Sequence, residues 1–265
     1  SPNPSVGAVA VKNNQIIARG YHQGPGEIHA EIMVLNQLPP NLTGVHLYVT
    51  LEPCGHWGRT PPCVDAIIAY GIEKVIYAYD DPNPVVKAHL GCDKLIHHQI
   101  ELLHYPLHEI DIFYASYTYW QRNQKPYVTA KWAQSLDAKV GLPGERIHLS
   151  NHRAFEFTHE SRLNSDILLT SAKTIEIDDP LFNVRLASQT IDKPLAIIDS
   201  RLRLTGKERV FSCKRPIIIY HHHSLDAKNR IEGVVYQGIE GKLGQLNLPK
   251  IIHDLGKRGY HDVWV

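Results

Sequence analysis

Short apolar segments alternate with helix-like segments twice along the 265-residue chain, and this pattern restricts the possible folds strongly. The two runs are separated by the polar stretch QRNQKP, residues 121–126, which ends in proline. Strands that alternate with helices favour a sheet covered by helices, and a polar stretch with proline is typical of a domain boundary. We therefore expect one α/β domain over residues 1–123 and a second over residues 124–265.

The first run begins with a predicted β-hairpin, in which the apolar segments 6–11 and 15–22 flank the sequence KNN. Consecutive asparagines suit the left-handed turn of a tight hairpin. The rest of this run predicts, in order, a helix from His29, a strand over 45–52, a helix from Cys63, a strand over 74–79 and a helical stretch over 107–122. The second run predicts a strand over 127–135, a helix over 153–163, strands over 167–170, 194–200, 216–222 and 234–238, a helix over 248–259 and a strand over 262–265.

The charge balance argues against a nucleic-acid or membrane partner. The chain has 28 Lys and Arg against 27 Asp and Glu, a formal net charge of +1, so it lacks the strong positive field that such partners require. Its first residues, SPNPSVGAVAV, lack the basic flank and long apolar segment of a signal peptide, and no apolar run approaches the length of a membrane span. We expect a cytoplasmic protein that acts on a small molecule.

The four cysteines are too few for a disulfide-held fold of this size, and two of them have the setting of metal ligands. Cys54 follows Glu and Pro at the end of a predicted strand, and Cys63 begins a predicted helix, as His29 does. Zn²⁺ prefers imidazole and thiolate ligands, and a helix start lowers the pKa of a thiol placed there. The sequence therefore predicts a zinc site with these three protein ligands and one open position.

Glu31 lies two residues from His29, where its carboxylate can reach the open position without binding the metal. Zinc makes hydroxide available near neutral pH, and a nearby carboxylate can carry the proton to a leaving group. The arrangement matches the His-x-Glu and Pro-Cys…Cys signature of zinc deaminases that act on nucleotide bases. Two alternatives stay open: a deaminase of another nucleotide or of a base in nucleic acid, and a non-catalytic module with structural zinc, for which Cys92 is the candidate fourth ligand.

The two cysteines are separated by the eight residues GHWGRTPP, where the commonest deaminase pattern has two. This insertion is expected to bring His56, Arg59 and Thr60 to the rim of the metal pocket. They could contact a phosphorylated substrate or belong to an ordinary solvated loop.

Several segments of both runs resemble one known family. In the first run they are PNPSVGAV, GYHQGPGEIHAE, YVTLEPCGHWGRTPPC and DDPNP, and in the second AQSLDAKV, TSAKTIEIDDPLFNVRL and AIIDS. They closely resemble the two halves of the bifunctional riboflavin-biosynthesis deaminase/reductase family, in the expected order and over nearly the whole chain. The resemblance implies an N-terminal cytidine-deaminase-like three-layer domain followed by a dihydrofolate-reductase-like α/β domain.

The same resemblance implies two reactions. The first is hydrolytic deamination of 2,5-diamino-6-ribosylamino-4(3H)-pyrimidinone 5′-phosphate, and the second is NADPH-dependent reduction of its ribosyl group to ribityl. In the deaminase half, His29, Cys54 and Cys63 would hold zinc, Glu31 would be the proton shuttle and Asn3 would hydrogen-bond the pyrimidine. Because the family tends to form dimers or tetramers, we expect a homo-oligomer.

The resemblance also implies two sets of residues in the reductase half. The substrate-binding set is Arg146, Arg162, Phe182 and Arg185, with the arginines at 162 and 185 suited to a phosphate group. The cofactor-binding set is Gln134, His148, Thr174, Asp178 and Ser200. Gln134 and His148 stand where the family has Ala and an aromatic residue, and Lys131 and Asp137 are expected to support the site.

The sequence ends at Val265, where the family continues into a turn rich in Glu and Gly. Backbone N–H groups of such a turn would contact cofactor phosphates. We therefore expect the reductase domain of this chain to be truncated at its C-terminal end and to lack part of the cofactor site.

Overall fold

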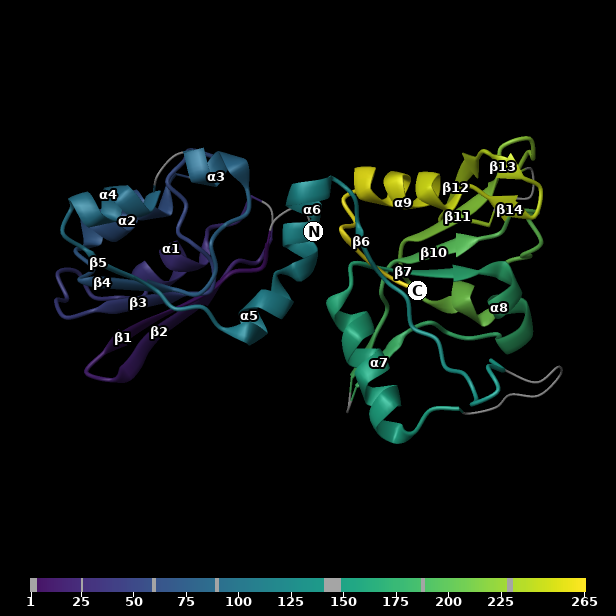
Figure 1. The fold of residues 1–265 in the computed structure, drawn as a ribbon, viewed down its shortest axis with the longest axis horizontal. Coiled ribbons are helices and arrows are strands. Elements are labelled where there is room, and N and C mark those ends of the chain that lie inside the picture. Colours follow the sequence, from purple (N-terminus) through teal and green to yellow (C-terminus); the bar gives the residue numbers. More distant parts are fainter. Residues whose placement is uncertain are drawn as a thin grey trace. The chain divides into compact units, whose positions relative to one another are not determined.

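The structure is a computed structural model that describes residues 4–24, 26–58, 61–88, 91–140, 149–186, 189–227 and 231–265. The chain divides into two compact units, Ser1–Gln124 and Lys125–Val265, here named unit 1 and unit 2 (Figure 1). Within the described ranges, every helix is too short or too polar to cross a membrane.

Unit 1 begins with the predicted hairpin. Strands β1 (Gly7–Lys12) and β2 (Gln15–Tyr21) pair antiparallel. Asn13 and Asn14 between them have φ values of 50° and 59°, the left-handed conformation that a two-residue turn of this kind requires. The expected hairpin with an Asn-Asn turn is confirmed.

The sheet of unit 1 has the order β2-β1-β3-β4-β5, and its further strands are β3 (His46–Val49), β4 (Lys74–Tyr77) and β5 (Glu101–His104). Strand β1 runs antiparallel to β3, whereas β3, β4 and β5 are parallel. The helices that pack with these strands are α1 (Ala30–Leu35), α2 (Cys63–Tyr70) and α4 (Gly91–His97), and α3 (Pro84–Ala88) lies near them (Figure 1). Their apolar side chains bury the core of the unit against the sheet.

The helical stretch expected over 107–122 is two helices, α5 (His108–Phe113) and α6 (Ala115–Asn123). The break falls at Tyr114, whose φ and ψ are −92° and 7° and whose side chain is buried. Its hydroxyl donates to the carbonyl oxygen of Ser5 at 2.8 Å and lies 2.8 Å from Thr50 Oγ1. The break therefore coincides with contacts between Tyr114 and residues far away in the sequence. A local sequence pattern does not reveal such contacts.

Unit 2 is built on a parallel sheet with the order β12-β11-β10-β7-β15-β6. Its strands are β6 (Tyr127–Thr129), β7 (Ile167–Ser171), β10 (Leu195–Ile198), β11 (Ile217–His222), β12 (Val234–Ile239) and β15 (Asp262–Trp264). Two short antiparallel pairs accompany it: β8 (Val184–Leu186) with β9 (Gln189–Ile191), and β13 (Gly241–Lys242) with β14 (Gln245–Leu246).

Buried clusters lie on both faces of this sheet. Helix α9 (Leu248–Lys257) contributes Ile251 and Leu255 to one, and α8 (Ala172–Asp178) contributes Ile175 to the other, which also includes Val210 of the short 3₁₀ helix η1 (Arg209–Ser212). Figure 1 shows α9 and α8 on opposite sides of the strands, and α7 (His152–Asn164) on the same side as α8. Because both faces of the sheet are covered, the side chains on both sides of each strand are buried. This explains why the strands are continuous apolar runs in the sequence.

The expected strand over 127–135 is shorter than predicted, because the structure has only β6, Tyr127–Thr129, in its place. Among the described strands, β6 lies at the edge of the sheet and pairs with β15 alone. Beyond the three pairs of this ladder, the N–H of Lys131 still donates to the carbonyl oxygen of Val265 at 3.0 Å.

Candidate functional site

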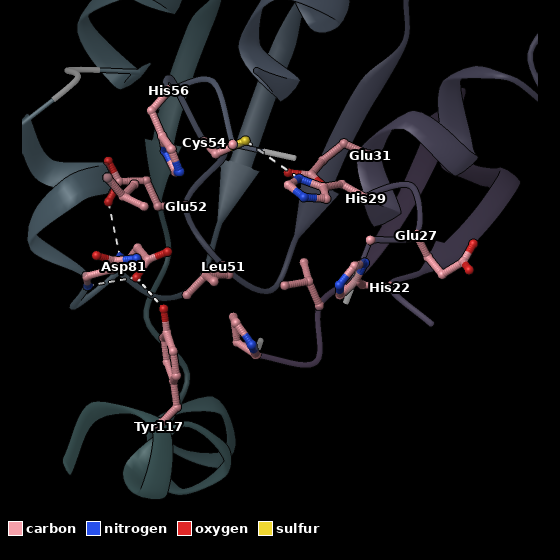
Figure 2. A pocket seen from close by; sticks show the side chains of 16 residues that line it. His22, Glu27, His29, Glu31, Leu51, Glu52, Cys54, His56, Asp81 and Tyr117 are labelled. Atoms are coloured by element: carbon pink, nitrogen blue, oxygen red, sulfur yellow. Dashed lines mark hydrogen bonds between the residues drawn. The ribbon is translucent and has the colours of Figure 1, made fainter. Parts of the chain in front are cut away.

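The three predicted zinc ligands come together in unit 1. The ligand atoms of His29, Cys54 and Cys63 all lie within 4.8 Å of one another. His29 Nδ1 is 3.0 Å from the sulfur of Cys63 and 3.6 Å from the sulfur of Cys54, and Figure 2 shows the imidazole facing the Cys54 sulfur. Tetrahedral zinc with one nitrogen and two sulfur ligands needs donor atoms roughly 3.5 Å apart. The donor set and its spacing therefore fit zinc.

Secondary structure explains why these three residues meet. His29 is the residue before α1, Cys63 is the first residue of α2, and Cys54 follows the end of β3. The backbone N–H of Cys63 donates to the Cys54 sulfur at 3.3 Å, which fixes the helix start against the strand end. Helix starts and a strand end thus converge as the sequence predicted.

The pKa values of the two thiols shift in opposite directions. Hydrogen bonds from Cys63 and from His29 lower the pKa of the Cys54 thiol to about 4. The pKa of Cys63 is raised instead of lowered, because the Cys54 sulfur beside it and its burial outweigh the effect of the helix start.

Glu31 occupies the first turn of α1 and is 4% exposed. Burial raises the pKa of its carboxyl group to about 7. A carboxyl group with a pKa near the working pH can both accept and donate a proton. Figure 2 shows the carboxyl group beside His29 and Cys54, so the group that sequence placed two residues from a ligand also lies near that ligand in space.

These groups open into a cavity of about 310 Å³. It is lined by two of the ligands and Glu31, and also by side chains that sequence reasoning did not single out: His22, Glu27, Leu51, Glu52, Asp81, Asn83, Val86 and Tyr117 (Figure 2). Asp81 and Asn83 belong to the motif DDPNP, which signalled the family but not a role. Their polar side chains give the cavity several hydrogen-bonding groups opposite the ligands.

A hydrogen-bond network holds the far wall of the cavity. The hydroxyl of Tyr117 and the N–H of Asn83 each donate to Asp81 Oδ1 at 2.9 Å. The N–H of Asp81 donates to Glu52 Oε2 at 3.1 Å, which links this wall to the segment after β3 that carries Cys54. Burial raises the pKa of Asp81. The network orients the wall from three different elements.

The remaining predicted residues of unit 1 have mixed outcomes. His56 lines the cavity, as expected for a residue at its rim. Asn3, Arg59 and Thr60 lie outside the described residues, although Pro4 and Val6, which follow Asn3, do line the cavity. Cys92 donates its thiol proton to Glu52 Oε1 at 3.3 Å and is not part of the ligand group found among the described residues. The alternative of Cys92 as a fourth ligand is therefore not supported.

In unit 2 the structure brings together three of the predicted substrate-binding residues. The guanidinium carbon of Arg162 lies 5.7 Å from the ring centre of Phe182, and that of Arg185 lies 5.6 Å from the ring centre of Phe155. Burial and the nearby charge of Arg185 lower the pKa of Arg162, and the buried Nε of Arg162 has no hydrogen-bond partner among the described residues. Two neighbouring positive groups with an unused donor suit an anionic ligand.

Phe182 has a left-handed backbone, with φ of 51°, which is unusual for an aromatic residue. The buried side chain of Arg215 donates to the carbonyl oxygen of Phe182 at 2.7 Å and also to that of Leu181. Such strain persists where surrounding groups enforce it, and it is frequent at binding sites.

The predicted cofactor residues spread along one edge of the sheet. Thr174 lies in the first turns of α8 after β7, where its N–H donates to Ser171 Oγ, and Ser200 follows β10. Because β7 and β10 are parallel neighbours, their carboxyl ends share the edge at which nucleotide cofactors bind in such sheets. Beside Ser200, the buried Oδ1 of Asp199 has no hydrogen-bond partner among the described residues, so it can accept from a hydroxyl group. These groups fit a nucleotide cofactor.

The other predicted reductase residues are less informative. Gln134 and Asp178 are exposed, the former in an irregular segment and the latter at the end of α8. Lys131 and Asp137 are also exposed, and the N–H of Lys131 donates to the carbonyl oxygen of Val265. Arg146 and His148 lie outside the described residues.

Two family models match the chain. The cytidine and deoxycytidylate deaminase zinc-binding region matches residues 1–79, and the RibD C-terminal domain matches residues 126–265. The riboflavin biosynthesis protein RibD of Escherichia coli is 34% identical over 100% of this chain and 75% of its own length. The chain belongs to the RibD family. RibD of Aquifex aeolicus is 37% identical, over 82% of this chain and 62% of its own length.

Solved structures agree with this assignment. A diaminohydroxyphosphoribosylaminopyrimidine deaminase/5-amino-6-(5-phosphoribosylamino)uracil reductase from Thermotoga maritima is 32% identical, with a TM-score of 0.85 over 100% of this chain and 74% of that chain. RibD of Acinetobacter baumannii is 30% identical, with a TM-score of 0.81 over the same shares. The expected fold class is confirmed: a cytidine-deaminase-like domain precedes a reductase domain. The chain is a RibD-type enzyme of riboflavin biosynthesis with a zinc-dependent deaminase domain and an NADPH-dependent reductase domain.

Proposed function

We propose that residues 1–123 deaminate 2,5-diamino-6-ribosylamino-4(3H)-pyrimidinone 5′-phosphate and that residues 124–265 reduce the ribosyl group of the deaminated product to ribityl. The observation that carries the deaminase proposal is the meeting of His29, Cys54 and Cys63 within 4.8 Å at a cavity into which the buried Glu31 also faces. Family membership supports the choice of substrate.

In the deamination, His29, Cys54 and Cys63 would hold zinc. When bound, zinc lowers the pKa of water, so that hydroxide is available near neutral pH. Glu31 accepts the proton that water loses and donates it to the departing 2-amino group, which leaves as ammonia. A pKa raised to about 7 suits both halves of this transfer. The polar wall formed by Asp81 and its neighbours orients the pyrimidine, and Asn3 would add a hydrogen bond to the ring.

In the reduction, Arg162 and Arg185 bind the substrate phosphate, and Phe182 packs against the substrate. Thr174, Ser200 and Asp178, with Gln134, would bind NADPH, which supplies a hydride to the sugar carbon. Arg146 and His148 complete the two sets. The protein's own contribution is to hold the sugar and the cofactor in a fixed relative position.

We also propose that the protein is a cytoplasmic homo-oligomer, a dimer or tetramer, with no nucleic-acid or membrane partner. The near-neutral net charge and the four cysteines, none of which forms a disulfide, support this setting. Light scattering of the purified protein tests the oligomeric state, and a monomeric mass at micromolar concentration would contradict it.

The decisive experiment for the deaminase is Glu31→Gln, which keeps the size of the side chain but removes its ability to carry a proton. We expect zinc content to stay at the wild-type level and ammonia release from the diaminopyrimidine phosphate to fall by about 10³-fold. Glu109→Gln, at an exposed position of α5, is the matched control and should leave both unchanged. Normal ammonia release by Glu31→Gln would overturn the proposed role.

A further inference from the structure

A histidine that none of the proposed roles uses lies between the two arginines of unit 2. Helix α7 places Phe155, His159 and Arg162 at intervals of four and three residues, so the three side chains share one face. Arg185 approaches this face from β8. His159 is 1% exposed, whereas Arg185 is exposed.

His159 makes a directional contact with the strand that carries Arg185. The backbone N–H of Arg185 donates to Nδ1 of His159 at 3.0 Å. A ring nitrogen that accepts a hydrogen bond carries no proton, so the proton of this imidazole is on Nε2. The ring also packs on Phe155, with 4.2 Å between the ring centres, and Phe155 lies under the Arg185 guanidinium. His159 thus contacts the backbone of Arg185 directly and its guanidinium group indirectly, through Phe155.

The electrostatic surroundings keep this ring neutral. Burial, followed by the charges of Arg162 and Arg185, lowers the pKa of His159 to about 4. A protonated ring would lose the acceptor that Arg185 uses and would add a third positive charge to the pair. The neutral ring satisfies a buried backbone donor without adding charge where the two arginines already repel each other.

We propose that His159 is a positioning residue that holds Arg185, and through it the arginine pair, in the geometry that binds the substrate phosphate. This inference rests on the proposed phosphate-binding role of Arg162 and Arg185. It goes beyond that role because it assigns contact with the phosphate to Arg162 and Arg185 and assigns their positioning to the buried His159.

The competing explanation is that His159 only fills space in the core. Two substitutions at His159 separate the explanations, because only one of them keeps a hydrogen-bond acceptor at the position of Nδ1. His159→Asn places an oxygen close to the former Nδ1 and can still accept from the Arg185 N–H, whereas His159→Leu keeps comparable bulk and removes the acceptor. A pure packing role predicts that leucine is tolerated at least as well as asparagine.

The experiment uses the full chain and measures the dissociation constants of ribose 5-phosphate and of ribose by calorimetry. We expect His159→Leu to weaken binding of ribose 5-phosphate by about 10-fold, with His159→Asn within about 3-fold of wild type, because a charge-assisted contact to phosphate is lost when its donor is displaced. Binding of ribose, which has no phosphate, should not change. His152→Leu, at the exposed start of the same helix, is the matched control.

Circular dichroism and urea unfolding of each variant show whether unit 2 has folded. Wild-type affinity in a folded His159→Leu, or equal losses in the leucine and asparagine variants, would overturn the positioning role. Arg162→Ala and Arg185→Ala distinguish failure of the proposed phosphate site from failure of the positioning role of His159. If these also bind ribose 5-phosphate normally, the phosphate site itself is wrong and the inference fails with it; if they bind weakly while His159→Leu binds normally, the inference alone fails.

Discussion

The candidate sites of the two units differ in what they bury. In unit 1 the proposed proton carrier Glu31 and the candidate ligand Cys63 are both buried, and burial raises the pKa of Glu31 to about 7. In the described part of unit 2 the supporting residues His159 and Arg215 are buried, while Arg185 is exposed. A site that makes and breaks bonds with its own side chains needs tuned pKa values, whereas a site that orients a substrate beside a cofactor needs stiff supports. The difference predicts that damage to one site leaves the other intact.

The largest effect is expected from Cys63→Ser, because it removes a ligand from the centre of unit 1. Zinc content should fall below stoichiometric, and ammonia release should drop by more than about 10³-fold, since the loss affects both the metal and the group it activates. NADPH oxidation with the deaminated substrate should stay within twofold of wild type. A parallel loss of the reductase activity would show that the two sites are not independent.

The reverse test is Arg162→Ala in unit 2. Losing one charge-assisted contact to phosphate should raise KM for the reduction by about 10- to 100-fold. Arg162→Lys should recover only part of this loss, because an ammonium group lacks the planar pair of donors. Ammonia release is the internal control, and a change in it would contradict the proposed separation.

Acidification should weaken unit 2 through His159. Its folded-state pKa is lowered to about 4, below the usual value near 6.5, so its contribution to stability is complete above pH 6.5 and is lost as pH falls towards 4. Between pH 7 and pH 5 the free energy of unfolding of unit 2 should decrease by about 2 kcal/mol from this group. Urea unfolding at both pH values measures the change. His159→Asn has no such group and should show a correspondingly smaller decrease; equal decreases in both proteins would refute the assignment.

The smallest effect is expected from Tyr117→Phe, which removes one of the two hydrogen bonds to Asp81 Oδ1. Because the N–H of Asn83 still donates to this oxygen, the cost to unit 1 should be about 1 kcal/mol. Thermal unfolding of the zinc-loaded protein measures it, and KM for deamination should rise if the wall orients the pyrimidine. An unchanged KM with lowered stability would limit the network to a structural role.

The local sequence pattern was sufficient to predict secondary structure where neighbouring residues decide the backbone conformation. Two asparagines defined the hairpin turn after β1, and Cys63 after two prolines marked the start of α2. Pattern failed where distant residues decide the conformation: the predicted helix over 107–122 breaks at Tyr114, whose hydroxyl donates to the carbonyl oxygen of Ser5.

The candidate sites show the same limit. The candidate zinc ligands were predicted because cysteine is rare in this chain and because His29, Cys54 and Cys63 stand in a characteristic sequence setting. Asp81, Tyr117 and His159 were not, because an acid, a tyrosine or a histidine in a sequence carries no mark of the partner it meets after folding.

The order of strands in unit 2 has a consequence for the timing of synthesis. Strand β6 is the first of that sheet to leave the ribosome, but its partner β15 follows every other described strand of the unit and inserts between β7 and β6. Nascent chains grow at about 5–20 residues per second and fold domain by domain from the N-terminus. Unit 1 can therefore complete its candidate zinc site while unit 2 still lacks the strand that joins β6 to the rest of its sheet. We expect a newly made polypeptide to gain its hydrolytic capacity before its reducing one.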